Sequence, residues 1–210
     1  MPPVTYPVRF SVAYPDRPLN RLTTFFRLFT AIPILIVLCS VSGGTWQWSS
    51  GRTTAQVAAG AGGLLFFGPL LMILFREKYP RWWFAWNLEL QRFTNRVGIY
   101  LALLDDRYPS TDGHQAVHLD YGYPVARIDL NRWLPLVKWL LAVPHYIVLF
   151  VLDIGVVAVV IVAWFAILFT GRYPPALFGF VAEVIGWHNR VVGYAITLVT
   201  DRYPPFRLTP

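Results

Sequence analysis

Long apolar runs separated by short polar segments dominate the pattern of the chain. The longest run extends from Asn131 to Phe169, and its one carboxylate, Asp153, stands near its midpoint. At ~1.5 Å rise per residue, a single helix of this length would be nearly twice as long as the ~30 Å hydrocarbon core of a bilayer. Asp153 and Gly155 offer turn chemistry. The pattern therefore predicts two membrane spans, about 132–152 and 154–170, that fold back on each other.

The first half of the chain predicts two more spans, at about 22–41 and 57–75, joined by a Gly/Ser/Thr loop at 42–56. Two further helical stretches, about 82–104 and 177–200, carry charged residues at helical spacing. An ionised residue at the centre of a span costs about 2.5–3.5 kcal/mol on insertion scales. We therefore expect these two stretches to be amphipathic helices at the membrane surface, with a re-entrant position as the alternative.

The second half of the sequence repeats the first. At an offset of 111, Leu19-Asn20-Arg21 returns as Leu130-Asn131-Arg132 and Arg27 returns as Lys138. At an offset of 94, Glu89, Asn95-Arg96 and Tyr100 return as Glu183, Asn189-Arg190 and Tyr194. Further matches are Lys78-Tyr79-Pro80 with Arg172-Tyr173-Pro174, Asp106-Arg107-Tyr108-Pro109 with Asp201-Arg202-Tyr203-Pro204, and Tyr6-Pro7-Val8 with Tyr123-Pro124-Val125. This predicts two repeats, 1–109 and 123–210, joined by a polar connector at 110–122.

The predicted fold is an all-α integral membrane protein. It has four transmembrane helices in two parallel repeats of two spans, and each repeat ends in an amphipathic interfacial helix. Seventeen of the 18 Lys and Arg residues then lie on one side of the membrane, with Arg52 alone on the other. By the positive-inside rule that side, with both termini, is cytoplasmic. If the third stretch of each half spanned the bilayer, the halves would be inverted instead.

Composition supports a polytopic membrane protein. Hydrophobic residues make up 56% of the chain and charged residues 14%, against about 25% in soluble domains. The net charge of +7 could indicate nucleic acid. However, the basic residues stand at the ends of apolar segments rather than in short runs, which favours membrane flanks. The single cysteine, Cys39, excludes an internal disulfide. No apolar leader follows the N-terminus, so we expect the chain to be retained whole.

Four basic-Tyr-Pro motifs end apolar or helical segments, at Pro80, Pro109, Pro174 and Pro204. A basic residue near lipid phosphate, an aromatic ring at headgroup level and a helix-stopping proline together make an anchoring device. Specific recognition of an anionic lipid is the alternative. The candidate contacts with lipid or a partner in three of these motifs are Arg107, Tyr108, Arg172, Tyr173, Arg202 and Tyr203.

A second set of candidates lies in the repeated helices. Glu89, Arg96 and Tyr100 have the same i, i+7, i+11 spacing as Glu183, Arg190 and Tyr194. Two helical turns are about 10.8 Å, too long for a direct Glu–Arg bond within one helix. We therefore expect Glu89 to pair with Arg27 and Glu183 to pair with Lys138, with a polar transport or binding site as the alternative.

No catalytic or cofactor motif stands out. His114 and His118 have an i, i+4 spacing but lie in a loop-like connector, which argues against metal binding. His145 and His188 have no counterparts in the first half, and haem ligation by them is disfavoured. We therefore expect neither a metal nor a cofactor, and no enzymatic activity.

The segments NRWLPLVKWLLAVPHYIVLF and WFAILFTGRYPPALF, followed by an amphipathic helix and DRYPPF, resemble the DUF4389 family of bacterial membrane proteins. The resemblance implies a bacterial inner-membrane location and contributes no catalytic residue. We expect a non-enzymatic accessory or scaffold subunit of a larger inner-membrane complex, in contact with anionic lipids and with a membrane-protein partner or a second copy. The alternative is a small transporter or lipid-binding protein with its site between the two repeats; a membrane enzyme ranks below both.

Overall fold

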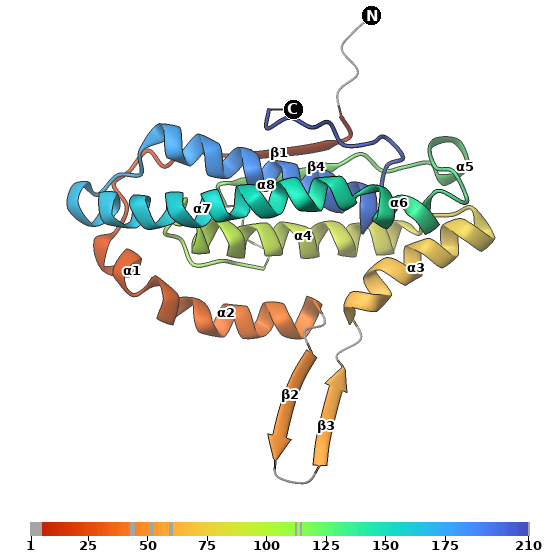
Figure 1. The fold of residues 1–210 in the computed structure, drawn as a ribbon, viewed down its shortest axis with the longest axis horizontal. Coiled ribbons are helices and arrows are strands. Elements are labelled where there is room, and N and C mark those ends of the chain that lie inside the picture. Colours follow the sequence, from red (N-terminus) through yellow and green to blue (C-terminus); the bar gives the residue numbers. More distant parts are fainter. Residues whose placement is uncertain are drawn as a thin grey trace, which may run out of the picture.

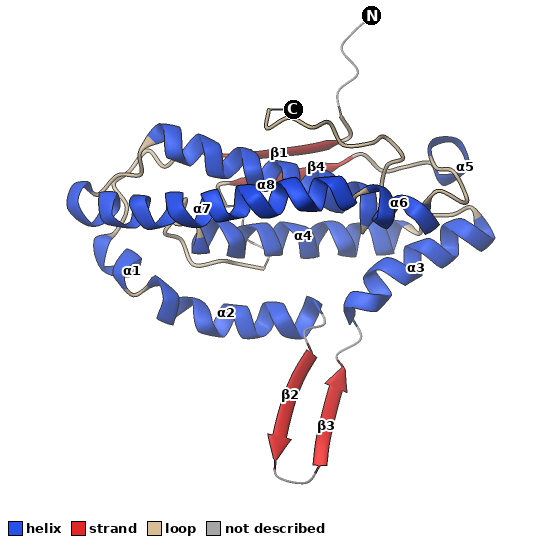
Figure 2. Cartoon of the chain, viewed as in Figure 1, coloured by secondary structure: helices blue, strands red, loops and turns tan. Residues whose placement is uncertain are grey.

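The computed structural model describes residues 6–42, 45–50, 53–58, 61–111, 113 and 115–209. The described chain is mostly helical, with two separate two-stranded antiparallel sheets (Figure 2). The first half contains β1 (Val8–Val12), α1 (Arg21–Phe25), α2 (Arg27–Ser42), β2 (Thr45–Ser50), β3 (Thr53–Ala58), α3 (Ala61–Arg76) and α4 (Arg81–Leu101). The second half contains β4 (Val117–Tyr121), α5 (Ala126–Asp129), α6 (Pro135–Leu141), α7 (Val143–Thr170) and α8 (Pro175–Ala195).

Local sequence signals explain where several helices begin and end. The Asn20 side chain caps α1 by accepting hydrogen bonds from the backbone N–H groups of Leu22 and Thr23. Pro175 occupies the first position of α8, where its missing N–H costs nothing. Gly171 ends α7 with φ of 75°, a left-handed conformation that glycine adopts without steric cost.

Helices α4, α7 and α8 form the centre of the molecule (Figure 1). Strands β1 and β4 pair antiparallel, with Phe10 opposite Leu119, and pack against α8 and α4. Helices α2 and α3 lie to one side of this centre, and the β2–β3 hairpin extends from them (Figure 1). One buried cluster joins α4, α7 and α8 through residues such as Ile99, Ile167 and Val181.

The predicted turn at Asp153–Gly155 is wrong, because α7 continues as one helix from Val143 to Thr170. Asp153 finds a partner without a turn, since its carboxylate lies 3.4 Å from His188 Nε2 on α8. Gly155 does not break the helix, and a Cβ there would make an ordinary contact with the Phe180 ring, at 3.6 Å. The spans 132–152 and 154–170 are therefore not separate helices, and four spans are not supported.

Among the described residues, α7 alone is long and apolar enough to cross a membrane. Helix α2 and the apolar segment Phe66–Arg76 of α3 are shorter. The predicted loop at 42–56 instead contains β2 and part of β3, and α3 begins at Ala61 rather than at residue 57. The alternation of Thr, Trp, Gln and Val in these strands explains their extended conformation. The side chains of Trp46 and Trp48, and all of Arg52, lie outside what the structure describes.

Much of the polar stripes of α4 and α8 lies inside the molecule, although the sequence predicted that they face the membrane surface. Asn95, Arg96, Asn189 and Arg190 are all buried. Most of the exposed large hydrophobic side chains of the centre are on α7, where Phe150 is 67% exposed. The apolar helix thus covers the polar ones. This inverted arrangement arises because the buried polar groups bond to one another and to backbone carbonyls.

Candidate functional site

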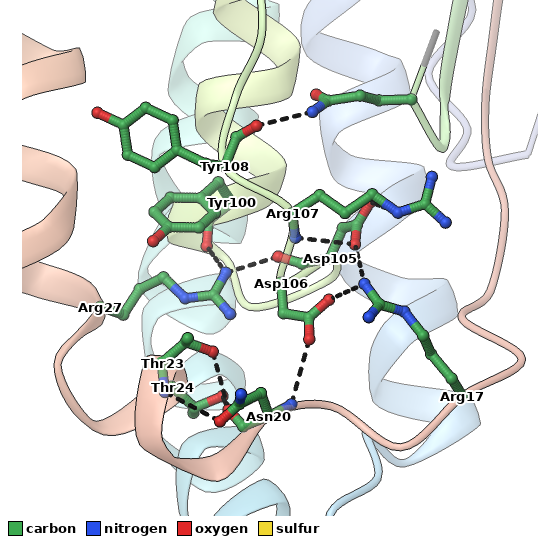
Figure 3. Close-up of polar contacts among 11 residues, drawn as sticks. Arg17, Asn20, Thr23, Thr24, Arg27, Tyr100, Asp105, Asp106, Arg107 and Tyr108 are labelled. Atoms are coloured by element: carbon green, nitrogen blue, oxygen red, sulfur yellow. Dashed lines mark hydrogen bonds and ion pairs between the residues drawn. The ribbon is translucent and has the colours of Figure 1, made fainter. Parts of the chain in front are cut away.

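Two buried cations stand at equivalent positions of the sequence pattern. Arg27, the first residue of α2, and Lys138 in α6 are 2% and 0% exposed. Arg27 Nη1 donates hydrogen bonds to the backbone oxygens of Tyr100 (2.7 Å) and Asp105 (2.6 Å), as Figure 3 shows. Lys138 Nζ donates to the backbone oxygen of Thr200 at 2.7 Å. Arg27 therefore binds one carbonyl in the last turn of α4, where the helix dipole is negative, and one in the segment that follows α4. Lys138 binds a carbonyl in the segment that follows α8.

Both cations also lie over an aromatic ring. The Arg27 guanidinium carbon is 4.1 Å from the Tyr100 ring centroid, and Lys138 Nζ is 5.2 Å from that of Tyr194. Cation–π attraction of this kind strengthens when the pair is desolvated. Tyr100 and Tyr194 thus serve as partners of the two buried cations, a role that their spacing alone did not predict.

The aspartates that follow the two central helices differ in whether they pair with the buried cation. Asp201 Oδ1 lies 2.6 Å from Lys138 Nζ, and Asp201 Oδ2 accepts from the backbone N–H of Asn131. Asp106 likewise accepts from the backbone N–H of Asn20, at 3.2 Å. However, its other oxygen binds Arg17 rather than Arg27 (Figure 3). Lys138 therefore has a carboxylate partner within hydrogen-bond distance, and Arg27 has none among the described residues.

The predicted pairs Glu89–Arg27 and Glu183–Lys138 are wrong. Glu89 Oε1 lies 2.6 Å from Arg92 Nη1, one helical turn away on α4, and this pair is largely exposed. Lys138 pairs with Asp201, as described above. Glu183 forms no ion pair with any other described residue. The repeated Asp-Arg-Tyr-Pro motif contained the signal for the acid that pairs with Lys138, since Asp201 is the first residue of its second copy.

The arginines of the repeated helices bind the segments that follow those helices. Arg96 Nη1 donates to the backbone oxygens of Ser110 and Thr111, each at 2.9 Å. Arg190 Nη2 donates to the backbone oxygens of Arg207 (2.5 Å) and Leu208 (3.1 Å). Desolvation lowers the pKa of the Arg190 guanidinium from its ordinary value. These contacts fix the chain after each helix, which is a structural role.

Asn95 and Asn189 join α4 to α8 directly. Asn95 Nδ2 donates to Asn189 Oδ1 at 2.7 Å, and Asn189 Nδ2 donates back to Asn95 Oδ1 at 2.9 Å. Each amide also donates to the backbone oxygen four residues before it. A buried amide pair that satisfies itself in this way fixes the register of the two helices.

The Tyr-Pro motifs separate into two kinds of environment. Tyr108 and Tyr203 are partly exposed and pack edge-on against Tyr100 and Tyr194. The side chain of Arg107 is exposed, 4.0 Å from Asp105. Arg172 and Arg202, the basic residues of the motifs that end at Pro174 and Pro204, are exposed as well. These exposed members remain candidates for contact with lipid or a partner.

Tyr79 and Tyr173 are buried instead, and burial raises the pKa of each phenol to about 12. The backbone oxygen of Tyr79 accepts a hydrogen bond from Tyr123, and that of Tyr173 accepts one from Tyr14. Tyr14, rather than Tyr6, therefore occupies the position that corresponds to Tyr123. The Tyr6 hydroxyl donates elsewhere, to the backbone oxygen of Arg202 at 3.1 Å.

The histidines of α7 and α8 contact aromatic and acidic side chains. His145 Nδ1 accepts from Trp187 Nε1 at 3.1 Å, and its ring stacks on Phe206 with 4.0 Å between centroids. His188 pairs with Asp153. Within the described ranges, no three His, Cys, Asp or Glu side chains gather into a metal site. His114 lies outside the described residues, so the pair that it would form with His118 is not addressed.

Comparison with known proteins finds a family match within the second half of the chain. No curated protein and no solved structure matches the sequence. Residues 133–207, which include α6, α7 and α8, match the model of a family described as a domain of unknown function, DUF4389. This match confirms the resemblance noted from the NRWLPLVKWLLAVPHYIVLF and DRYPPF segments. Residues 133–207, about a third of the chain, are therefore similar to the DUF4389 family.

Proposed function

We propose that this protein is a non-enzymatic integral membrane protein that serves as an accessory or scaffold subunit of a larger membrane assembly. The observation that carries this proposal is the exposed apolar face of α7, a helix of 28 residues. Ile147, Phe150, Ile154 and Val157 are each at least 60% exposed. Exposed apolar surface of this extent is typical of contact with lipid or with another protein.

The neighbouring helices extend this apolar surface. On α2, Leu28 and Phe29 are more than two-thirds exposed, and on α6 Trp139 and Leu140 are more than half exposed. Phe25 of α1 stacks on Trp164 of α7, with 6.0 Å between ring centroids, so the surfaces of these helices adjoin. A continuous apolar face on several helices supports membrane embedding better than one isolated helix would.

A bacterial inner membrane, with a multi-pass arrangement and both termini cytoplasmic, is part of the proposal. The basic residues at the ends of the apolar segments support it through the positive-inside rule. The contact between Tyr6 and Arg202 supports it as well, because it joins the two end segments of the chain. Arg27 and Lys138 each bind a backbone oxygen in or after a central helix, and this similarity supports two related halves. The hydrogen bonds between Asn95 and Asn189 support a common centre for these halves.

A scaffold role is favoured over catalysis by the way in which the buried polar groups are used. Arg96, Lys138, Arg190 and the two asparagines each hold a backbone segment or a neighbouring helix in place. Such contacts stabilise a fixed surface. The exposed rings of Tyr108 and Tyr203 would then be available to lipids or to the partner.

Mild purification from native membranes tests this proposal. Under alkaline carbonate wash, the chain should remain in the membrane pellet; release into the supernatant would refute membrane embedding. After extraction in a gentle detergent, native mass spectrometry should find a membrane-protein partner at fixed stoichiometry. A chain that remains in the pellet but purifies alone would refute the subunit role and retain the membrane location.

A further inference from the structure

An apolar groove of about 280 Å³ lies between α1–α2 and α7, beside the buried guanidinium of Arg27. Its lining is almost entirely apolar and comes from the described helices and the segment after α4; it includes Phe25, Leu28, Leu103, Ile161 and Trp164. Several of these side chains belong to the exposed apolar face proposed to meet lipid. The groove is therefore open to an apolar ligand that arrives from the membrane.

Arg27 is the single charged residue in the lining of this groove. Its Nη1 is satisfied by two backbone oxygens, but Nε and Nη2 are buried and have no hydrogen-bond partner. A buried donor without an acceptor is destabilising, and more so when the group is charged. Such an arrangement is unusual enough to indicate a missing acceptor.

Of the two buried cations at corresponding positions, Lys138 has a carboxylate partner among the described residues and Arg27 has none. Lys138 occupies the corresponding position and has Asp201 at 2.6 Å. The matching acid of the first half, Asp106, binds Arg17 instead (Figure 3). The carboxylate that would complete the Arg27 site is therefore held away from it by a second arginine.

We propose that the groove binds one acyl chain of an anionic phospholipid, whose phosphate accepts hydrogen bonds from Arg27 Nε and Nη2. A planar guanidinium binds phosphate oxygens in a bidentate manner. Arg27 lies near the start of its apolar helix, which suits a headgroup at the polar boundary and a chain directed into the groove. This inference rests on the proposed membrane location.

The lipid must reach two nitrogens that are buried beside the groove. Phe25 and Leu28 flank the groove and are 55% and 77% exposed, so neither is locked by packing. Rotamer changes of exposed side chains occur within picoseconds to nanoseconds. Phe25 and Leu28 can therefore move aside for an acyl chain in the groove without any movement of the helices.

Native mass spectrometry of the full-length protein in detergent tests the proposal, with phosphatidylglycerol and phosphatidylcholine added separately. We expect one phosphatidylglycerol to remain bound where phosphatidylcholine does not. Arg27→Gln should reduce its retention by about tenfold or more, since charge-assisted hydrogen bonds are lost. Leu28→Trp fills the groove and should have a similar effect, whereas Phe29→Trp, on an adjacent exposed residue of α2 that does not line the groove, should have none.

A further variant tests whether Asp106 can compete with the lipid phosphate for Arg27. Arg17→Gln frees Asp106 to approach Arg27, so it should weaken phosphatidylglycerol retention although Arg17 does not line the groove. Equal retention of both lipids would overturn the anionic headgroup, and inorganic phosphate that displaces the lipid fully would overturn the acyl-chain component. No lipid retention, in a protein that stays in carbonate-washed membranes, would overturn this inference and leave the proposed membrane location intact.

Discussion

The Lys138–Asp201 pair provides the strongest stability prediction, because Lys138 is fully buried. In Asp201→Asn, the ammonium would keep the Thr200 backbone oxygen and the Tyr194 ring, and would lose its one carboxylate. Breaking one side of a buried ion pair costs about 3–5 kcal/mol, since the remaining charge is uncompensated. The Asp201 side chain is 20% exposed, so we expect a loss near the lower end, about 3 kcal/mol.

Reversible unfolding in detergent, followed by tryptophan fluorescence, measures this loss. Lys138→Met combined with Asp201→Asn should recover part of it, because the double variant no longer buries an unpaired charge. Glu89→Gln is the matched control: its pair with Arg92 is exposed and should contribute about 0–1 kcal/mol. If Asp201→Asn destabilises the protein no more than Glu89→Gln does, the argument from burial is refuted.

Two glycine substitutions test the packing of the helices, and a change of pH tests the burial of two phenols. Gly68→Ala should destabilise the protein by about 1–3 kcal/mol in the same unfolding assay, because a Cβ there would lie 2.2 Å from the Trp83 ring. Gly98→Ala in α4, with nothing within 4 Å, should instead stabilise it by about 0.5–1 kcal/mol, and equal effects would contradict the packing. Tyr79 and Tyr173, with pKa raised from 10.0 to about 12, stay protonated in the folded state while the unfolded chain ionises. Stability should therefore fall as pH rises from 10 towards 12, by up to about 1.4 kcal/mol per pKa unit for each tyrosine. A pH titration of phenolate absorbance that finds all tyrosines ionising near pH 10 in the folded protein would contradict their burial.

The helical class was predictable from the apolar runs, and the similarity to DUF4389 from the segments of the second half. The continuity of α7 through Asp153 was not predictable, because residues with turn chemistry are also accommodated within a helix when a partner is available. His188, on another helix, supplies that partner, and sequence spacing does not reveal it. Local propensity is therefore overridden here by tertiary contact.

The sequence predicted the buried cations of the candidate site, but it did not predict their acidic partners. Arg27 and Lys138 stood out as cations within apolar segments, and both are buried polar centres. Their predicted acids were Glu89 and Glu183, because these have matching repeat positions on the amphipathic helices. The actual acid, Asp201, follows its helix, at a place where the chain turns back towards the cation. Such a return depends on the end of the helix, which the repeat pattern does not specify.

The central claim is that the exposed apolar face of α7 lies in a membrane. Spin labels placed singly at Ile147, Ile154 and Ile161, all on this face, report directly on that environment in phospholipid vesicles. The account predicts frequent collisions with dissolved oxygen, which partitions into lipid, and rare collisions with a water-soluble nickel complex at all three positions. Frequent collisions with the nickel complex along the whole face, in vesicle-bound protein, would contradict the claim.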